Sequence, residues 1–226
     1  MRSKARSDLL YEAGDLSWTD NNVNLVALAM FCCLTVFLFF LIGCNWVRSK
    51  TEEFLPTATL NLPVIEVRDE FLPYKEFCQR NPGECDMSGP TIIELTPKMK
   101  SLLSEVNTSV NLEIRFALDK DQYNKEEFWT YPRSDLGDCE DIALEKRSRL
   151  TKLGFPRGAL RMAIGLHKKT LTSHALLLVK TTEGKYVMDR ITNQISLWCQ
   201  TPYNFESQER TDGKWERFDQ NIWTFY

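Results

Sequence analysis

The sequence lacks internal repeats and low-complexity tracts, and it has no stripe of basic residues. Its 28 Lys and Arg side chains against 31 Asp and Glu give a formal net charge of −3. Because nucleic acids bind proteins through basic side chains that displace counterions, this balance argues against a nucleic-acid partner. Histidine is scarce too, with only His167 and His174 in the chain. The length of 226 residues suits one globular domain plus an appendage.

The appendage is a long apolar run at residues 25–44, LVALAMFCCLTVFLFFLIGC, which contains no charged side chain. As a helix, a run of this length matches the hydrocarbon thickness of a bilayer, about 30 Å. Trp18 and Trp46 flank the run, where indole rings prefer the membrane interface. We therefore predict one uncleaved N-terminal transmembrane helix within residues 23–47. Basic residues lie on both sides of it, so the orientation stays open.

Two other interpretations of the apolar run remain open. It could be a cleaved secretory signal, although an acidic leader of this length is atypical. Leu41–Cys44 also resembles a bacterial lipoprotein cleavage site, which would leave Cys44 as the lipidated first residue. All three interpretations export the remainder of the chain, and they differ only in how it is tethered.

Composition divides the chain into four parts. Residues 1–22 are a polar N-terminal segment, and residues 23–47 are the anchor. Residues 48–63 form a linker that contains Pro56 and ends at Pro63. The globular domain is expected to occupy residues 64–226.

The seven cysteines fall into distinct groups. Cys78 and Cys85 flank an Asn-Pro-Gly turn, and a short loop of this kind can bring two cysteines within bridging distance. In an oxidising compartment we expect this pair to form a disulfide. Outside the apolar run, Cys139 and Cys199 are left over, and a free thiol in an exported protein suggests a chemical role for one of them.

Cys139 stands in the sequence Gly-Asp-Cys-Glu-Asp, where a helix predicted over 139–153 begins. The start of a helix offers unpaired backbone N–H groups and the positive end of its dipole, which favour a thiolate over a thiol. The same N–H groups can hold a developing oxyanion. The alternative interpretation is purely structural, with Asp138 as the helix cap and Cys139 as a small buried residue.

Other periodic segments frame this helix. Helices are predicted at residues 73–80 and after Thr96-Pro97, a cap followed by proline in the first turn. Short apolar strands are predicted at residues 160–166, 174–180 and 185–190.

The last two predicted strands form a hairpin. If Lys180 faces Lys185 across the turn, His174 and Asp189 lie on the same face of the sheet, within reach of a hydrogen bond.

The chain resembles the bacterial transglutaminase-like cysteine peptidases, the family of LapG-like periplasmic adhesin proteases. The resemblance is carried by Trp129, Pro132, Gly137–Asp141, His174-Ala175 and Asp189. It implies an α+β fold with a papain-like or transglutaminase-like core, in which the helix that bears the cysteine packs on an antiparallel sheet. It also implies that Cys139 is the nucleophile, His174 the general base and acid, and Asp189 the orienting carboxylate. With one of two histidines engaged in this way, a zinc site is not expected.

LapG-like enzymes depend on calcium, and the resemblance implies a calcium site at the acids that flank the cysteine, Asp138, Glu140 and Asp141. Hard oxygen ligands suit this ion, and Asp135 is a further candidate nearby. Uncompensated acids beside Cys139 would raise its pKa, and a bound cation would relieve that effect. The structural alternative is that the acids cap the helix and complement its dipole.

The expected function is a membrane-tethered periplasmic cysteine endopeptidase that cleaves an exported protein such as a surface adhesin. The resemblance also makes the bacterial inner membrane and a cyclic-di-GMP receptor candidate partners. The alternatives are a transglutaminase-type acyl transferase, which uses the same triad, and a non-catalytic binding module. The chain departs from the family in a short segment at residues 130–136 and in Arg190, where asparagine is common; the latter bears on substrate preference.

Overall fold

The computed structural model describes residues 62–69 and 72–219. The predicted anchor at residues 23–47, its two alternatives and most of the predicted linker lie outside these residues. Within the described residues, no helix combines the length and the apolar character that a membrane crossing requires.

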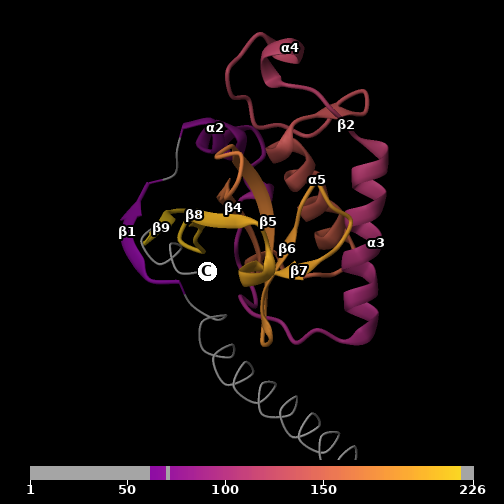
Figure 1. Cartoon of the computed structure of the whole chain (residues 1–226), viewed down its shortest axis with the longest axis vertical. Coiled ribbons are helices and arrows are strands. Elements are labelled where there is room, and N and C mark those ends of the chain that lie inside the picture. The colour runs from indigo at the N-terminus through magenta and orange to yellow at the C-terminus, as the bar shows by residue number, and fades with distance from the viewer. Residues whose placement is uncertain (1–61, 70–71, 220–226) are drawn as a thin grey trace, which may run out of the picture. The chain divides into compact units, whose positions relative to one another are not determined.

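In the described part of the chain, a seven-stranded antiparallel sheet runs through the domain in the order β1-β9-β8-β4-β5-β6-β7 (Figure 1). Its strands are β1 (Val64–Arg68), β4 (Leu160–His167), β5 (Ser173–Thr181), β6 (Gly184–Met188), β7 (Ser196–Leu197), β8 (Tyr203–Glu209) and β9 (Trp215–Phe218). A second, parallel pair consists of β2 (Arg115–Phe116) and β3 (Leu136–Gly137). The mixed α and β architecture with an antiparallel sheet agrees with the predicted fold class.

The helices of the described residues are α2 (Leu72–Arg80), α3 (Pro97–Glu113), α4 (Asp119–Tyr123) and α5 (Cys139–Lys152). Short 3₁₀ turns occur at Pro82–Glu84, Arg157–Ala159 and Trp198–Gln200. The helix α5 contacts both β5 and the long helix α3 (Figure 1).

The start of α3 follows the predicted capping pattern. The Thr96 hydroxyl accepts a hydrogen bond from the Met99 backbone N–H at 3.2 Å, and Pro97 occupies the first turn, where its missing N–H costs nothing.

The strand β5 is buried on both faces, which explains its continuous apolar sequence. Ala175, Leu177 and Val179 belong to the core cluster on the helix side of the sheet, where Leu144 and Leu150 of α5 also pack. Leu176 and Leu178 alternate with them and belong to a second cluster on the opposite face, together with the buried residues Leu62, Ala163, Val187, Trp198, Tyr203, Phe205 and Phe218. The domain therefore has a core on each side of its central strand.

The hairpin between β5 and β6 has the predicted register. Lys180 pairs with Lys185 and Thr181 with Gly184, so that Thr182 and Glu183 form a two-residue turn. Leu178 pairs with Val187, and both side chains belong to the core cluster on the face of the sheet opposite α5. Paired residues of the two strands therefore share a face, as the prediction for His174 and Asp189 requires.

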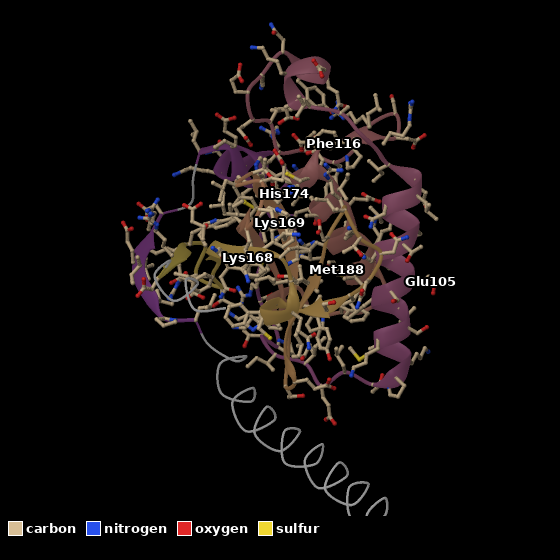
Figure 2. All side chains as sticks on the ribbon, in the orientation of Figure 1. Glu105, Phe116, Lys168, Lys169, His174 and Met188 are labelled. Carbon is tan, nitrogen blue, oxygen red and sulfur yellow. A yellow bond between two sulfur atoms is a disulfide. The ribbon has the colours of Figure 1, made fainter. Side chains whose placement is uncertain are left out.

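A disulfide and a buried ion pair hold α2 and α5 in place. Cys78 and Cys85 are bonded, with their Cα atoms 5.5 Å apart. In the loop that this bond closes, the Glu84 carbonyl accepts a hydrogen bond from the Arg147 guanidinium of α5 at 3.2 Å. Arg147 also donates to a carboxylate oxygen of Glu209 on β8 at 2.9 Å, and its side chain is fully buried. The side chains are drawn in Figure 2.

Lys146, the neighbour of Arg147 on α5, is buried without a partner among the described residues. Its side chain is fully inaccessible, and its ammonium group forms no hydrogen bond to any of them. Burial lowers the pKa of Lys146 to about 7, while the charge of Asp189 opposes this shift and that of Arg190 adds to it. The buried Lys146 therefore makes the folded chain less stable than an apolar residue at this position would.

We expect Lys146→Met to be more stable than the wild type at neutral pH. Between about pH 7 and 10.5, the ordinary pKa of a lysine, the folded chain has released a proton that the unfolded chain still binds. Wild-type stability therefore rises with pH there, and the advantage of the variant shrinks by up to about 1.4 kcal/mol per pH unit. Urea unfolding of both proteins from pH 6 to 10 measures this difference.

The exposed Lys152→Met, on the same helix, is the matched control, with little change expected. A Lys146→Met protein that is less stable than the wild type at pH 7 would contradict the prediction.

Candidate active site

Cys139 is the first residue of α5, and Asp138 occupies the N-cap position. The chain approaches this helix through Gly137 at the end of β3. A Cβ at position 137 would lie 2.9 Å from the Cβ of Asp141, so a side chain there would clash with the first turn of α5. The glycine of Gly-Asp-Cys is thus needed for the close approach that places the cysteine.

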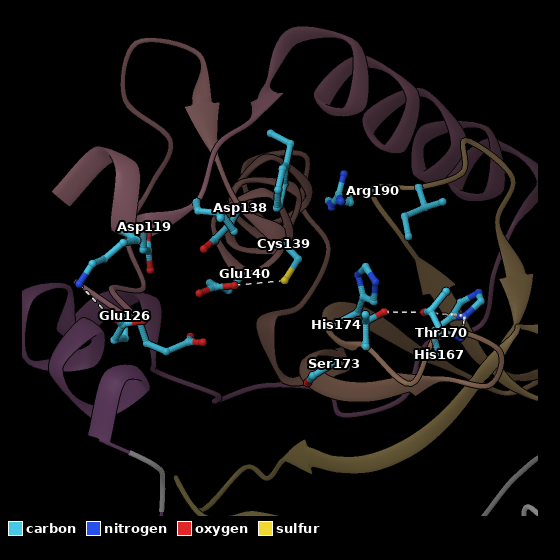
Figure 3. A pocket seen from close by; sticks show the side chains of 16 residues that line it. Asp119, Glu126, Asp138, Cys139, Glu140, His167, Thr170, Ser173, His174 and Arg190 are labelled. Carbon is cyan, nitrogen blue, oxygen red and sulfur yellow. Dashed lines mark hydrogen bonds and ion pairs between the residues drawn. The ribbon is translucent and has the colours of Figure 1, made fainter. Parts of the chain in front are cut away.

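The Cys139 sulfur lies between α5 and the beginning of β5. It accepts a hydrogen bond from the Ala175 backbone N–H at 3.4 Å and donates one to the Glu140 carboxylate at 3.2 Å. Cys139 and His174 line the same cavity, of about 590 Å³ (Figure 3). The fold thus brings residues 139 and 174 to one cavity across 35 positions of sequence.

The surroundings of Cys139 favour the thiol over the thiolate. Burial raises the pKa of Cys139 well above its usual value, and the negative charges of Glu140 and Asp138 raise it further. The hydrogen bond from Ala175 acts in the opposite direction. The effect of the flanking acids on the thiol has the direction expected from the sequence.

His174 and Asp189 are not joined by the hydrogen bond that the sequence predicts. The Nδ1 atom of His174 is buried and has no partner among the described residues. Each carboxylate oxygen of Asp189 has another donor: the Ile191 backbone N–H at 3.1 Å, and the Tyr203 hydroxyl at 2.6 Å. No hydrogen bond joins Cys139 to His174 within the described part of the chain either.

The charge of Asp189 nevertheless acts on the imidazole. Burial lowers the pKa of His174, the nearby Asp189 opposes this shift, and Arg190 and His167 add to it. The structure thus places the three predicted residues in one region, but the His174 side chain makes no hydrogen bond there to Cys139 or to Asp189.

Tyr203 is the residue of this region that sequence reasoning missed. Its ring lies 5.6 Å from the ring of His174, and its hydroxyl binds Asp189. Tyr203 belongs to β8, and β4 lies between β8 and β5, which carries His174. Gly165 of β4 leaves space for the Tyr203 side chain to reach over this strand. A Cβ at position 165 would approach Tyr203 Cβ at 3.2 Å. Nothing in the local sequence marks Tyr203, and Gly165 within the mostly apolar strand β4 is the sole signal.

An acidic cluster occupies the other side of the cavity. One oxygen each from Asp119, Asp138 and Asp141 lie within 4.8 Å of one another, and so do oxygens from Asp119, Glu127 and Glu140. The three acids expected from the sequence are therefore part of the cluster. Asp119 and Glu127 were not anticipated, because they come from a segment that only the fold brings close.

The carboxylates of the cluster lack some of the hydrogen-bond donors that buried oxygens need. Four of them, Asp119, Asp138, Glu140 and Asp141, each have a buried oxygen without a hydrogen bond to any described residue. Asp138 makes no side-chain cap bond, which removes the main support for a capping role. Asp135 is exposed and stays outside the cluster.

Burial is the main cause of large pKa shifts in these acids. It raises the pKa of Asp138 to about 6, of Asp141 to about 8 and of Glu140 to about 10, and their mutual repulsion adds to the effect. Buried, unpaired carboxylate oxygens from several residues are a fitting donor set for a hard cation such as calcium.

Two further residues take positions that the sequence left open. Trp129 is buried in the core, where its ring contacts Tyr74 at 5.2 Å and Trp215 at 6.4 Å, so it packs rather than lines the cavity. His167, the last residue of β4, does line the cavity, and its Nδ1 atom accepts hydrogen bonds from the backbone N–H groups of Lys169 and Thr170 in the turn that follows.

A sequence profile of the family described as bacterial transglutaminase-like cysteine proteinase BTLCP matches residues 66–222. The chain belongs to this family. Membership supports a cysteine peptidase, and the matched region includes Cys139, His174 and Asp189.

Solved structures of LapG from Legionella pneumophila are also similar to this chain. The EGTA-treated form shares 22% identity with a TM-score of 0.47, covering 56% of this chain and 71% of its own. The calcium-bound form shares 19% identity with a TM-score of 0.47, covering 66% of this chain and 84% of its own. A comparison with curated proteins finds no match.

We expect Tyr203→Phe to lower kcat by about tenfold and to leave KM nearly unchanged. The phenyl ring keeps the contact with His174, but the carboxylate of Asp189 loses a buried, charge-assisted hydrogen bond that fixes its orientation. Steady-state kinetics on a peptide substrate, with the melting temperature measured alongside, separates this effect from a loss of folding.

Tyr186→Phe is the matched control for this variant, because the Tyr186 hydroxyl binds the exposed Glu183 on the hairpin, remote from the cavity. Equal kcat values for Tyr203→Phe and Tyr186→Phe would show that Tyr203 does not position the acid.

Proposed function

We propose that this chain is a cysteine endopeptidase that acts through Cys139, His174 and Asp189. Membership of the family supports the peptidase class. The observation that carries the assignment of residues is the shared cavity, in which the sulfur of Cys139 touches the backbone beside His174. The Asp189 carboxylate accepts a hydrogen bond from Tyr203, whose ring lies 5.6 Å from the ring of His174.

The proposed reaction begins with rotation of the half-buried His174 side chain toward the sulfur. The imidazole accepts the thiol proton, and the Cys139 thiolate attacks the carbonyl carbon of a peptide bond. Backbone N–H groups at the start of α5 stabilise the oxyanion. The imidazolium then protonates the leaving amine, and a water molecule hydrolyses the acyl-enzyme while His174 acts as the base.

Asp189 orients the imidazole and stabilises its cationic form during these steps. This role requires that one of its oxygens accept a hydrogen bond from Nδ1 of His174 in addition to its present donors. A carboxylate has about four lone-pair positions, and two are used by Ile191 and Tyr203. The acid can therefore serve His174 without releasing either donor.

Calcium is the proposed cofactor. The acids Asp119, Asp138, Glu140 and Asp141 would hold it, with Glu127 at the exposed side. When bound, the ion would supply positive charge beside Cys139, which favours the thiolate. Glu140, which accepts a hydrogen bond from the Cys139 thiol, is one of the acids that would hold the ion.

The proposed setting is the periplasmic side of the bacterial inner membrane, with an exported protein such as an adhesin as substrate. The anchor, the receptor for cyclic-di-GMP and the substrate are proposals that rest on the sequence and its family resemblance alone. They are separable from the chemistry of the cavity.

Cys139→Ala should abolish turnover. We expect a loss of at least about a thousandfold in kcat, because the reaction has no other nucleophile. The assay follows exported-protein fragments, or a peptide library, with the full chain in the presence of calcium. Cys199→Ala removes the other free thiol of the described residues, which lies outside the cavity, and should leave turnover unchanged.

Residual turnover by Cys139→Ala at the wild-type rate would refute the peptidase assignment. Adding a primary amine to the same assay separates hydrolysis from acyl transfer, because a transferase would incorporate the amine into most of the product, whereas a peptidase would release mainly the free acid.

Calcium should stabilise the folded chain. At a concentration about 100-fold above Kd, binding adds about 2.7 kcal/mol, which we expect to raise the melting temperature by about 5–10 °C. EGTA should reverse the shift. Asp141→Asn should weaken it strongly, since Asp141 is fully buried in the cluster.

Asp135→Asn makes the same change of charge at an exposed acid outside the cluster and should behave as the wild type. Melting curves that coincide with calcium and with EGTA would exclude the cation site.

A further inference from the structure

The cavity that contains Cys139 has two ends of opposite character. On one side of the sulfur lie the acids, among them Asp138 and Glu140, and on the other lie His174 and Arg190 (Figure 3). The acidic end has a proposed occupant, whereas nothing yet accounts for the positive charge at the other end. Arg190 is the residue that carries it.

Arg190 is held in place without a charged partner among the described residues. Its guanidinium lies over the ring of Phe116, 4.0 Å from the centroid. Its Nε atom is buried and unpaired, and neither a hydrogen bond nor an ion pair joins its guanidinium to any other residue that the structure describes. The neighbouring Asp189 directs its oxygens to Tyr203 and Ile191 instead.

Stacking on an aromatic ring fixes the plane of a guanidinium and leaves its N–H edges free. A planar, fixed fork of donors matches a carboxylate in two parallel hydrogen bonds. In a half-enclosed cavity, such a pair is stronger than on an open surface, because fewer water molecules compete. Arg190 is therefore prepared for an anion that the described part of the chain does not provide.

The place of Arg190 decides which part of a substrate could supply this anion. In the proposed reaction, His174 protonates the leaving amine, so the chain beyond the cleaved bond departs on the histidine side of Cys139. Arg190 lines the cavity on that side, and its charge is close enough to His174 to lower its pKa. The apolar side chains of Phe116 and Ile191 line the cavity beside it.

We propose that Arg190 is a specificity-determining residue that binds a carboxylate of the substrate on the leaving-group side of the cleaved bond. The ligand class is a polypeptide with Asp or Glu directly after that bond. A free C-terminal carboxylate has the same chemistry and is the second source. This inference rests on the proposed peptidase function and adds to it a preference that neither the nucleophile nor the cation site requires.

Matched peptides test the inference with the full chain and calcium. Three peptides, blocked at both ends, carry Glu, Gln or Lys directly after the cleaved bond. A fourth is the Gln peptide shortened so that its free α-carboxylate follows this residue, and a fifth is its amide. We expect kcat/KM to be at least about tenfold higher for Glu than for Gln, the size typical of a charge-assisted hydrogen bond.

Three variants assign the preference to the guanidinium. In Arg190→Gln the Glu-to-Gln ratio should fall to about one, and in Arg190→Lys it should be intermediate, since the charge remains and the fork is lost. Arg115→Gln removes an exposed arginine that does not line the cavity and should keep the wild-type ratio. A ratio that decreases with added salt would support an ionic contact.

Binding of the same peptides to Cys139→Ala, measured by calorimetry, gives a readout that needs no turnover. Tighter binding of Glu than of Gln, lost on adding Arg190→Gln, supports the inference. A preference for the free carboxylate over its amide, without one for Glu, assigns the site to chain ends. Equal binding and turnover of all five peptides would overturn the inference and leave the peptidase function standing. Absence of turnover in the wild type, with Arg190-dependent binding intact, would overturn the peptidase function alone.

Discussion

The packing of α5 against β5 is the contact on which the site depends. The apolar side of this helix rests on the helix-facing side chains of β5, and the helix begins where the strand begins. That alignment brings the Cys139 sulfur to the Ala175 backbone N–H, and His174 immediately precedes Ala175 in the chain. Arg147 prevents α5 from sliding, because its buried guanidinium is tied to Glu209 of β8 and to the loop that the disulfide closes. Core packing and the position of the Cys139 sulfur are thus set by the same helix.

The electrostatics of the cavity follow from burial more than from net charge. Acids that would be ionised in water are buried around Cys139 without enough donors, so each negative charge there opposes the others and the thiolate. Such an arrangement is costly for folding alone and suits a site that is completed by a cation. On the opposite side of the sulfur, Arg190 places positive charge in the cavity. The cavity therefore has acidic groups on one side of the Cys139 sulfur and positive charge on the other.

Local pattern was sufficient to predict the elements that carry the site. The cap at Thr96, the start of the cysteine helix and the pairing of Lys180 with Lys185 all depend on residues close in sequence, where turn chemistry and periodicity decide. Asp119 and Tyr203 could not be found in this way. Each reaches the site through long-range contacts, and Tyr203 also depends on the space that Gly165 leaves for it. The expected His–Asp hydrogen bond is absent because two other donors bind the acid: the nearby Ile191 backbone N–H and the Tyr203 hydroxyl, which comes from a different strand.

The edge of the sheet has a consequence for how the domain can be engineered. The strand β1 pairs with β9, and Val64 lies directly opposite Phe218, so the first and last described strands are neighbours. Three strands, β9, β8 and β4, separate β1 from β5, which carries His174. A short peptide could join the start of β1 to the end of β9, and new ends could be opened in the exposed turn at residues 211–213. The domain is accordingly suited to circular permutation, with fusion partners attached at a border remote from the cleft.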